Sequence, residues 1–210
     1  KFNLKIIDEN GQFIRAPEPS PAHESAEALL KAILRGGHRE WRAPEHIFSR
    51  LAYDRYSGFL NLPLALYSDL ATWVKFAERG GVRTLTNTSI GWRSHQQGTS
   101  SGYRIENGGK LLQALLGFLQ WLESHLKNHS IAHYEKRCVG FIVNELRRMQ
   151  PPVPWRMIAQ FTERAKALAP HQHGVRLQVI FAIGFSHIRK LPLIAPLLHW
   201  RYRRKIAHRT

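Results

Sequence analysis

The chain has 210 residues, including ten Phe and six Trp, so it can build a hydrophobic core and is not a disordered polycation. Its 31 Lys and Arg against 15 Asp and Glu give a formal net charge of +16, which favours polyanionic partners and says nothing about fold. The single cysteine, Cys138, excludes an intramolecular disulfide and a cysteine-rich zinc site, and no apolar run is long enough to span a membrane.

The N-terminal segment predicts a short β-hairpin. Phe2, Leu4 and Ile6 alternate with polar residues, and Asn10-Gly11 precedes a second apolar pair. Asn-Gly between short apolar runs favours a hairpin, because both residues tolerate positive φ.

No apolar signal-peptide core is present, and the start at Lys1 rather than Met leads us to expect a trimmed, longer native protein. Together with the low cysteine content, this favours a cytoplasmic protein.

Apolar residues at helical spacing predict three helices before residue 81. These helices are expected over 22–35, 44–56 and 64–79. Pro44 suits the first turn of the second helix, in which Ile47 and Leu51 repeat. Paired glycines at 36–37 and 80–81 end the first and third helices.

The stretch 82–109 is rich in Gly, Ser, Thr, Asn and Gln. Structureless loops of this length are uncommon inside compact domains, so it is expected to be a polar hairpin or a linker. Its cations and aromatic residues make a nucleic-acid-contacting wing an alternative to a plain connecting loop. These residues are Arg83, Trp92, Arg93, Tyr103 and Arg104.

Helices also dominate the second half. Apolar stripes predict helices over 110–126, 131–149 and 155–168, a buried helix or strand over 175–185, and a last helix over 196–206. The fold class is therefore mainly α, as one or more multi-helix domains with a short N-terminal hairpin. We expect an N-terminal unit over 1–81, the polar segment over 82–109 and a basic helical domain over 110–210, or one continuous domain.

His125, His129 and His133 lie four residues apart, a spacing that on one helix would suit a transition metal. The apolar stripes of 110–126 and 131–149 would, however, lie on opposite sides of one continuous helix. The helix is therefore expected to break around 127–130, so that the histidines do not share a face. We expect no metal site and no cofactor.

Signals of catalysis are few. The chain has no Walker A loop, no GxGxxG, no HExxH and no nucleophile elbow, which favours a non-enzymatic protein. Residues 64–122 loosely resemble the helical core-binding domain of tyrosine recombinases, and His173-Gly-Val-Arg176 matches that family's HxxR box. This resemblance implies DNA binding, with Tyr202 at the place of a nucleophile. The family's first arginine and its lysine have no assignable counterpart.

The charged side chains in the last quarter of the chain are all positive, because no acidic residue follows Glu163. Such asymmetry is typical of nucleic-acid binding. The residues predicted to contact nucleic acid there are Arg189, Lys190, Trp200, Arg201, Tyr202, Arg203, Arg204, Lys205 and Arg209.

The sequence thus favours a non-enzymatic nucleic-acid-binding protein, for DNA or RNA, that contacts the phosphate backbone. It is expected to have protein partners in a larger nucleoprotein complex. One alternative is a peripheral membrane or protein-interaction module, since apolar residues recur every four positions beside the terminal cations. These are Ile194, Leu198, Tyr202 and Ile206. The other alternative is a metal-independent nuclease or recombinase.

Overall fold

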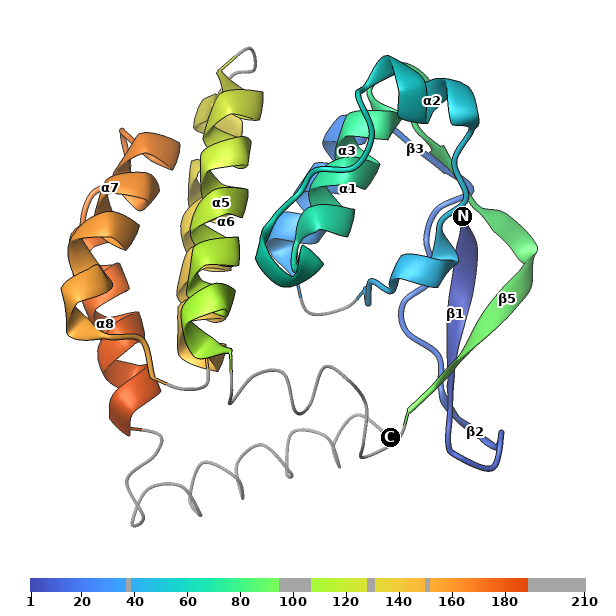
Figure 1. The fold of residues 1–210 in the computed structure, drawn as a ribbon, viewed down its shortest axis with the longest axis horizontal. Coiled ribbons are helices and arrows are strands. Elements are labelled where there is room, and N and C mark those ends of the chain that lie inside the picture. Colours follow the sequence, from blue (N-terminus) through green and yellow to red (C-terminus); the bar gives the residue numbers. More distant parts are fainter. Residues whose placement is uncertain (37–38, 95–106, 128–130, 150–151, 189–210) are drawn as a thin grey trace.

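The computed structural model describes residues 1–36, 39–94, 107–127, 131–149 and 152–188, and it is mainly α-helical, as the sequence predicts. Figure 1 shows a small sheet on one side, α1 and α3 next to it, and the helices α5 to α8 beyond them. The last predicted helix, over 196–206, lies outside the described residues.

The N-terminal hairpin is confirmed. Strand β1 (Phe2–Ile7) pairs antiparallel with β2 (Phe13–Arg15). In the turn, Gly11 has a φ of 85°, and the Asp8 carboxylate accepts the backbone N–H groups of Asn10 and Gln12 at 2.9 and 2.7 Å. Local chemistry therefore determines this turn.

The polar stretch after residue 81 contributes strands to the fold. Strand β5 (Leu85–Arg93) pairs in parallel with β1, giving the sheet order β2-β1-β5. A two-residue pairing joins β3 (His23–Glu24) to β4 (Val82–Arg83). The sequence predicts a loop or a local hairpin over 82–109 instead. A local pattern does not reveal this pairing, since the partner strand β1 is far away in the sequence and parallel strands need a long crossover between them.

Helices α1 (Ala26–Arg35) and α3 (Ser68–Ala77) lie beside the strands, and α1 contacts β3. The Ser25 hydroxyl accepts the backbone N–H of Ala28 at 3.1 Å and caps α1, which ends at Gly36 with a φ of 62°. The end of α1 is where the glycines predict it, but its start at Ala26 lies four residues later than expected, because His23–Glu24 form a strand and Ser25 caps the helix.

The segment 43–56 is less helical than the sequence predicts. Ala43–Glu45 form the 3₁₀ turn η1, and only Arg50–Arg55 form the helix α2, which buries no side chain. The chain is extended at His46, and Ser49 caps a new helix by accepting the N–H of Ala52. Pro44 therefore starts a short turn instead of a long helix, and Ile47 remains 69% exposed.

Four longer helices complete the fold: α5 (Gly108–Leu126), α6 (Glu135–Arg148), α7 (Ile158–Leu168) and α8 (Val175–Ile188). Helix α5 ends at Leu126 and α6 begins at Glu135 after the 3₁₀ turn η3 (Ile131–His133), so the expected helix break is confirmed. Residues 175–185, which sequence periodicity leaves open, are helical.

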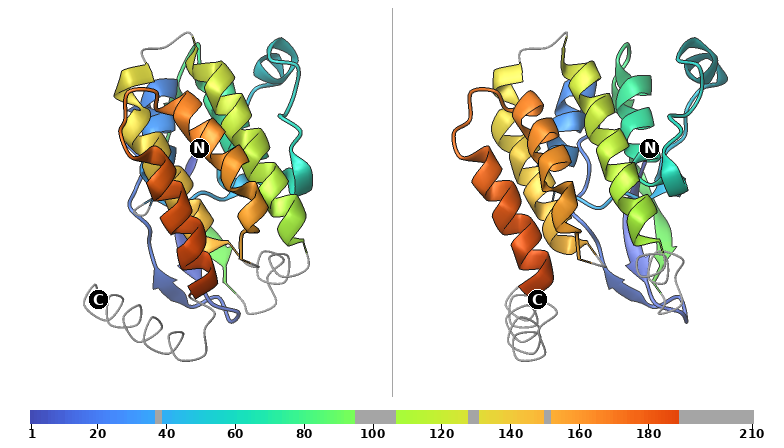
Figure 2. Two further views of the ribbon diagram at one scale, coloured as in Figure 1. Left: turned by 90° about the vertical axis from the view of Figure 1, so that its left-hand side faces the viewer. Right: turned by 60° about the vertical axis from the view of Figure 1, so that its left-hand side comes forward.

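The helices pack in a ring around the core. Helix α1 contacts α3 and α6, α3 contacts α5, and α7 contacts both α5 and α6. The core of this ring includes the fully buried Phe118 and Phe161, and one continuous apolar cluster extends from Leu29 to Ile183. Helix α8 packs against α6 and α7 from outside the ring, and Figure 2 shows it at the outer edge of the molecule.

Candidate nucleic-acid interface and an arginine-lined cavity

Most of the predicted nucleic-acid contacts lie outside the described residues. Those are Tyr103, Arg104, Arg189, Lys190, Trp200, Arg201, Tyr202, Arg203, Arg204, Lys205 and Arg209. Arg83 is exposed on β4, and Trp92 and Arg93 end β5. The Arg42 guanidinium lies 5.3 Å from the centre of the Trp92 ring, and Arg93 donates to the backbone carbonyl of Glu9. Their contact with nucleic acid remains a prediction.

Most carboxylates of the described residues are engaged within the chain. Glu24 binds Arg39 through two hydrogen bonds of 2.6 and 2.8 Å. Glu40 pairs with Arg15 at 2.5 Å and with Arg42 at 3.0 Å. Further ion pairs to Lys or Arg are made by Glu27, Glu45, Asp54, Glu123 and Glu145. Among the described residues, half of the negative charge is therefore offset by Lys or Arg within the chain.

The remaining exposed cations form the surplus. In the part of the chain that the structure describes, the following Lys and Arg are exposed and have no carboxylate in ion-pair distance: Lys5, Arg35, Arg55, Arg79, Arg83, Arg93, Lys110, Lys127, Lys136, Arg137, Arg147, Arg156, Lys166 and Arg176. Such charges attract phosphate and retain this ability because no internal partner neutralises them.

Four of these cations gather where several helices begin or end. We call Arg35, Lys110, Arg147 and Arg156 the basic end. Arg35 ends α1, Lys110 lies in the first turn of α5, Arg147 lies at the end of α6, and Arg156 lies in the 3₁₀ turn η4 (Trp155–Met157) before α7. Helix C-termini carry partial negative charge, which stabilises cations such as Arg35 and Arg147 there.

Contacts between the helices bring these ends together. Arg147 lies over the Phe185 ring at 5.6 Å, and the Trp155 ring stacks on His187 at 4.7 Å. The ends of α6 and α8 and the start of α7 are therefore neighbours. In sequence, Arg189-Lys190 follows Ile188 directly, so the basic C-terminal stretch is joined to the chain beside the basic end.

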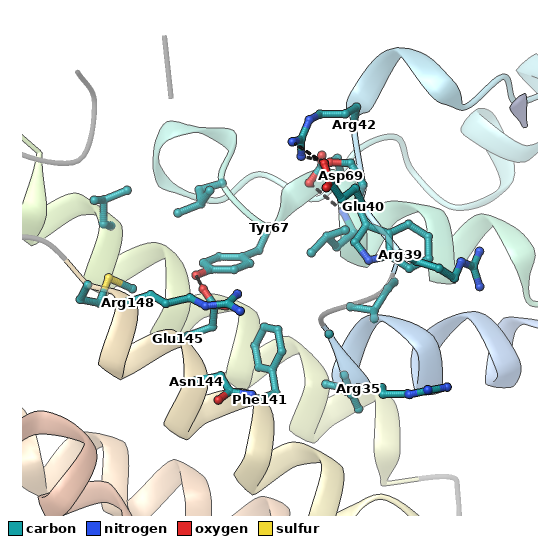
Figure 3. Close-up of a pocket in the computed structure, with 18 of the residues that line it drawn as sticks. Arg35, Arg39, Glu40, Arg42, Tyr67, Asp69, Phe141, Asn144, Glu145 and Arg148 are labelled. Atoms are coloured by element: carbon teal, nitrogen blue, oxygen red, sulfur yellow. Dashed lines mark hydrogen bonds and ion pairs between the residues drawn. The ribbon is translucent and has the colours of Figure 1, made fainter. Parts of the chain in front are cut away.

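A cavity of about 730 Å³ lies at the same end. Figure 3 shows Tyr67, Phe141, Glu145 and Arg148 along one wall, with the segment from Arg39 to Arg42 facing them. Its lining also includes Arg35, Asp69, Asn144 and aliphatic side chains such as Leu34 and Leu111. This size and mixture of apolar and polar groups are usual for small-molecule sites.

Tyr67 and Glu145 form the polar centre of one wall. The Tyr67 hydroxyl donates to the Glu145 carboxylate at 2.6 Å, and Arg148 approaches the same carboxylate at 3.6 Å. Burial raises the pKa of Asp69, although its carboxylate accepts the N–H of Leu70. Leu64 and Tyr67 have φ values of 60° and 63°, a strained conformation for such residues that occurs preferentially at functional sites.

A buried polar network supports the segment that forms the facing wall. The Lys1 ammonium lies 4.8 Å and the Arg39 guanidinium 4.5 Å from the centre of the Trp41 ring, while the Lys1 and Glu45 side chains pair at 3.3 Å. His46 stacks on Trp73 with ring centres 3.6 Å apart, and burial lowers the pKa of His46 to about 2. This network rigidifies residues 39–46 and holds them against α3.

His125 and His133 belong to different elements, His125 to α5 and His133 to η3. His125 stacks on Trp121 at 5.0 Å and has its Nδ1 3.6 Å from Glu78, whereas His133 is exposed. His129 lies outside the described residues, and within those that are described no group of three His, Cys, Asp or Glu is placed to hold a metal ion. His173 and Arg176, the HxxR pair, are both exposed at the start of α8.

Comparisons with known protein families, with curated proteins and with solved structures found no match. No helix in the described ranges is long and apolar enough to cross a membrane. Sequence reasoning missed the cavity, because its lining comes from segments far apart in the chain; only the run of arginines at 35, 39 and 42 signalled it.

Proposed function

We propose that the chain is a non-enzymatic nucleic-acid-binding protein, for DNA or RNA, which contacts the phosphate backbone. One observation carries the proposal: half of the carboxylates of the described residues are held in ion pairs with Lys or Arg, whereas the cations of the basic end have no acidic partner there. A surface of this kind supplies phosphate contacts without a code for base sequence.

Binding in this proposal is driven by the release of counterions from the nucleic acid. Each phosphate that a Lys or Arg neutralises displaces condensed cations, so affinity falls steeply as salt rises. The basic end offers four such groups, and the sequence-predicted residues from Arg189 to Arg209 would extend the same contact along the strand. Trp200 and Tyr202 would add stacking on exposed bases.

The protein would act in the cytoplasm as a subunit of a larger nucleoprotein complex. Phosphate contacts of this type position a protein without selecting a sequence. Protein partners would therefore supply the specificity, and they would leave the basic end facing the nucleic acid.

A pair of charge-matched variants tests this proposal. The first changes Lys110, Arg147 and Arg156 to Gln at the basic end. The control changes Lys127, Lys136 and Lys166 to Gln, since these lie at the end of α5, the start of α6 and the end of α7, at the other end of the same helices. Both variants lose the same charge, and all six residues are exposed.

Binding to a labelled duplex is measured for both variants across about 50 to 200 mM salt. The basic-end variant should lower the slope of log affinity against log salt by up to about 2.7, at about 0.9 per lost phosphate contact. The control should change it much less. Equal slopes for the two variants would show that net charge alone, and not the basic end, attracts the nucleic acid.

The C-terminal stretch is tested in the same assay. Changing Arg201, Arg203, Arg204 and Lys205 together to Gln should lower the slope by about two to four units, at about one per contact. Affinity should fall for all sequences alike. If this variant binds as tightly as the parent with the same slope, the terminal cations make no contact.

A further inference from the structure

Helix α8 has an unusual outward face. Its buried side chains include Val175, Val179, Ala182, Ile183 and Ser186, and they lie along one side of the helix. At 100° per residue, the side directly opposite carries Leu177, Phe181, Gly184 and Ile188. The positions that a surface helix normally fills with charged residues are therefore apolar.

These side chains are exposed in the single chain. Phe181 is 68%, Leu177 58% and Ile188 47% exposed, and the neighbouring Trp155 is 53% exposed. Figure 2 shows no described element outside α8 that covers this face. Contiguous exposed apolar patches on a folded domain mark interaction sites.

Gly184 in the middle of this face has no explanation within the chain. Glycine inside a helix costs up to about 1 kcal/mol relative to alanine. A Cβ added at Gly184 would meet only the Trp155 ring edge at 3.6 Å, an ordinary contact, so alanine would fit. The glycine leaves a shallow notch, bordered by Trp155, in an otherwise bulky stripe.

We propose that this face of α8 joins two copies of the chain in an antiparallel, two-fold symmetric helix pair. The stripe residues are spaced four, three and four apart, which is the seam spacing of packed helices. With the two-fold axis midway between Phe181 and Gly184, each Phe181 faces the Gly184 notch of the other copy. The same axis sets Leu177 opposite the partner's Ile188. A single register therefore places the bulky Phe181 against a glycine and the two aliphatic side chains against each other.

The exposed apolar area supplies a large part of what such a contact needs. The exposed parts of Trp155, Leu177, Phe181 and Ile188 amount to roughly 400 Å² per copy, or roughly 800 Å² for two. Specific interfaces bury about 1,200–2,000 Å² in total, so the stripe would supply more than a third, and residues beside it would have to bury the remainder in the proposed dimer. A lipid surface is the less fitting partner, because Gly184 would gain nothing from it.

Salt distinguishes this contact from nucleic-acid binding. Two copies that each carry +16 repel one another, and added salt screens this repulsion. Dimerisation should therefore strengthen as salt rises, whereas binding to phosphate weakens. The proposal is independent of the proposed function, and either can fail alone.

Sedimentation velocity of the full chain tests the dimer. Phe181→Gln should shift the monomer–dimer equilibrium toward monomer by at least tenfold. Ile47→Gln, an equally exposed apolar residue away from α8, should leave it unchanged. A parent chain that remains monomeric at high salt and high concentration overturns the proposal, as does equal dimerisation of both variants.

Cross-linking tests the register. In a Cys138→Ala background, the double variant Leu177→Cys/Ile188→Cys should be cross-linked efficiently by a short bis-maleimide. Each single variant should not, because its two thiols would lie about 16 Å apart along the helix pair. Cross-linking of a single variant would indicate a parallel pair and overturn the proposal. Absence of cross-links, with a monomeric chain that binds anionic vesicles, would assign the face to lipid instead.

Discussion

The ion pair between Glu24 and Arg39 gives the sharpest test of how the segment beside the cavity is held. The two side chains make hydrogen bonds of 2.6 and 2.8 Å and are only 3% and 11% exposed. Arg39 also donates to the Ser20 hydroxyl at 2.8 Å and lies over the Trp41 ring. Glu24→Gln keeps the size of the side chain but leaves a buried guanidinium without its counter-charge.

Removing one partner of a buried ion pair costs about 3–5 kcal/mol, and the slight exposure of Arg39 indicates the lower part of that range. Asp54→Asn is the matched control, because the Arg50–Asp54 pair is also within hydrogen-bonding distance, at 2.9 Å, but is exposed. It should cost no more than about 0.5 kcal/mol.

Equilibrium urea unfolding measures the free energy of unfolding of both variants, with an unchanged slope confirming the same transition. Replacing both partners, as Glu24→Leu with Arg39→Met, should recover most of the loss, since no buried charge is then left unpaired. If Glu24→Gln costs as little as Asp54→Asn, water reaches the pair and the reasoning about burial is refuted.

Three other predictions concern single residues. Burial lowers the pKa of His46 to about 2 in the folded chain, against 6.5 in the unfolded chain, so the stability that the neutral ring contributes is complete above pH 6.5 and is lost below it, by up to about 1.4 kcal/mol per pH unit. In urea unfolding, the free energy of unfolding of His46→Phe should therefore fall less between pH 6 and 4 than that of the parent, and an unchanged pH profile would contradict the burial of the ring. Burial raises the pKa of the Cys138 thiol to about 12, so native protein should not react with a thiol reagent at pH 8 until denaturant is added. Gly81→Ala should lower the melting temperature, because φ is +66° and the new Cβ would lie 2.4 Å from the Glu24 carbonyl oxygen. Gly140→Ala, on the open face of α6, should raise it, and a lower melting temperature for both variants would contradict the open space described at Gly140.

The helices could be predicted where one face is apolar and the other polar. The stripe through Leu111, Leu115 and Phe118 predicts α5, and its phase difference from the stripe of α6 predicts the break after Leu126. The sequence of α8 did not decide between a helix and a strand, because apolar residues lie on both its buried and its outward side and weaken the periodic signal.

Long-range pairing accounts for what the sequence did not predict. Strand β5 depends on β1 as a template, and its Thr- and Asn-rich sequence carries no apolar alternation of its own. The cavity likewise depends on bringing Arg35, Tyr67 and Glu145 together from three distant segments. The sequence predicted the surplus of positive charge, but which cations remain without acidic partners depends on the packing of α1 and α6.

One binding measurement tests the proposed function most directly. The full chain is titrated with duplex DNA, single-stranded DNA, structured RNA and anionic vesicles, each across a salt series. We expect tighter binding to at least one nucleic acid than to vesicles, with log affinity falling linearly against log salt at about 0.9 per phosphate contact on the duplex. A flat salt response, or tighter binding to vesicles than to every nucleic acid, would contradict the proposal.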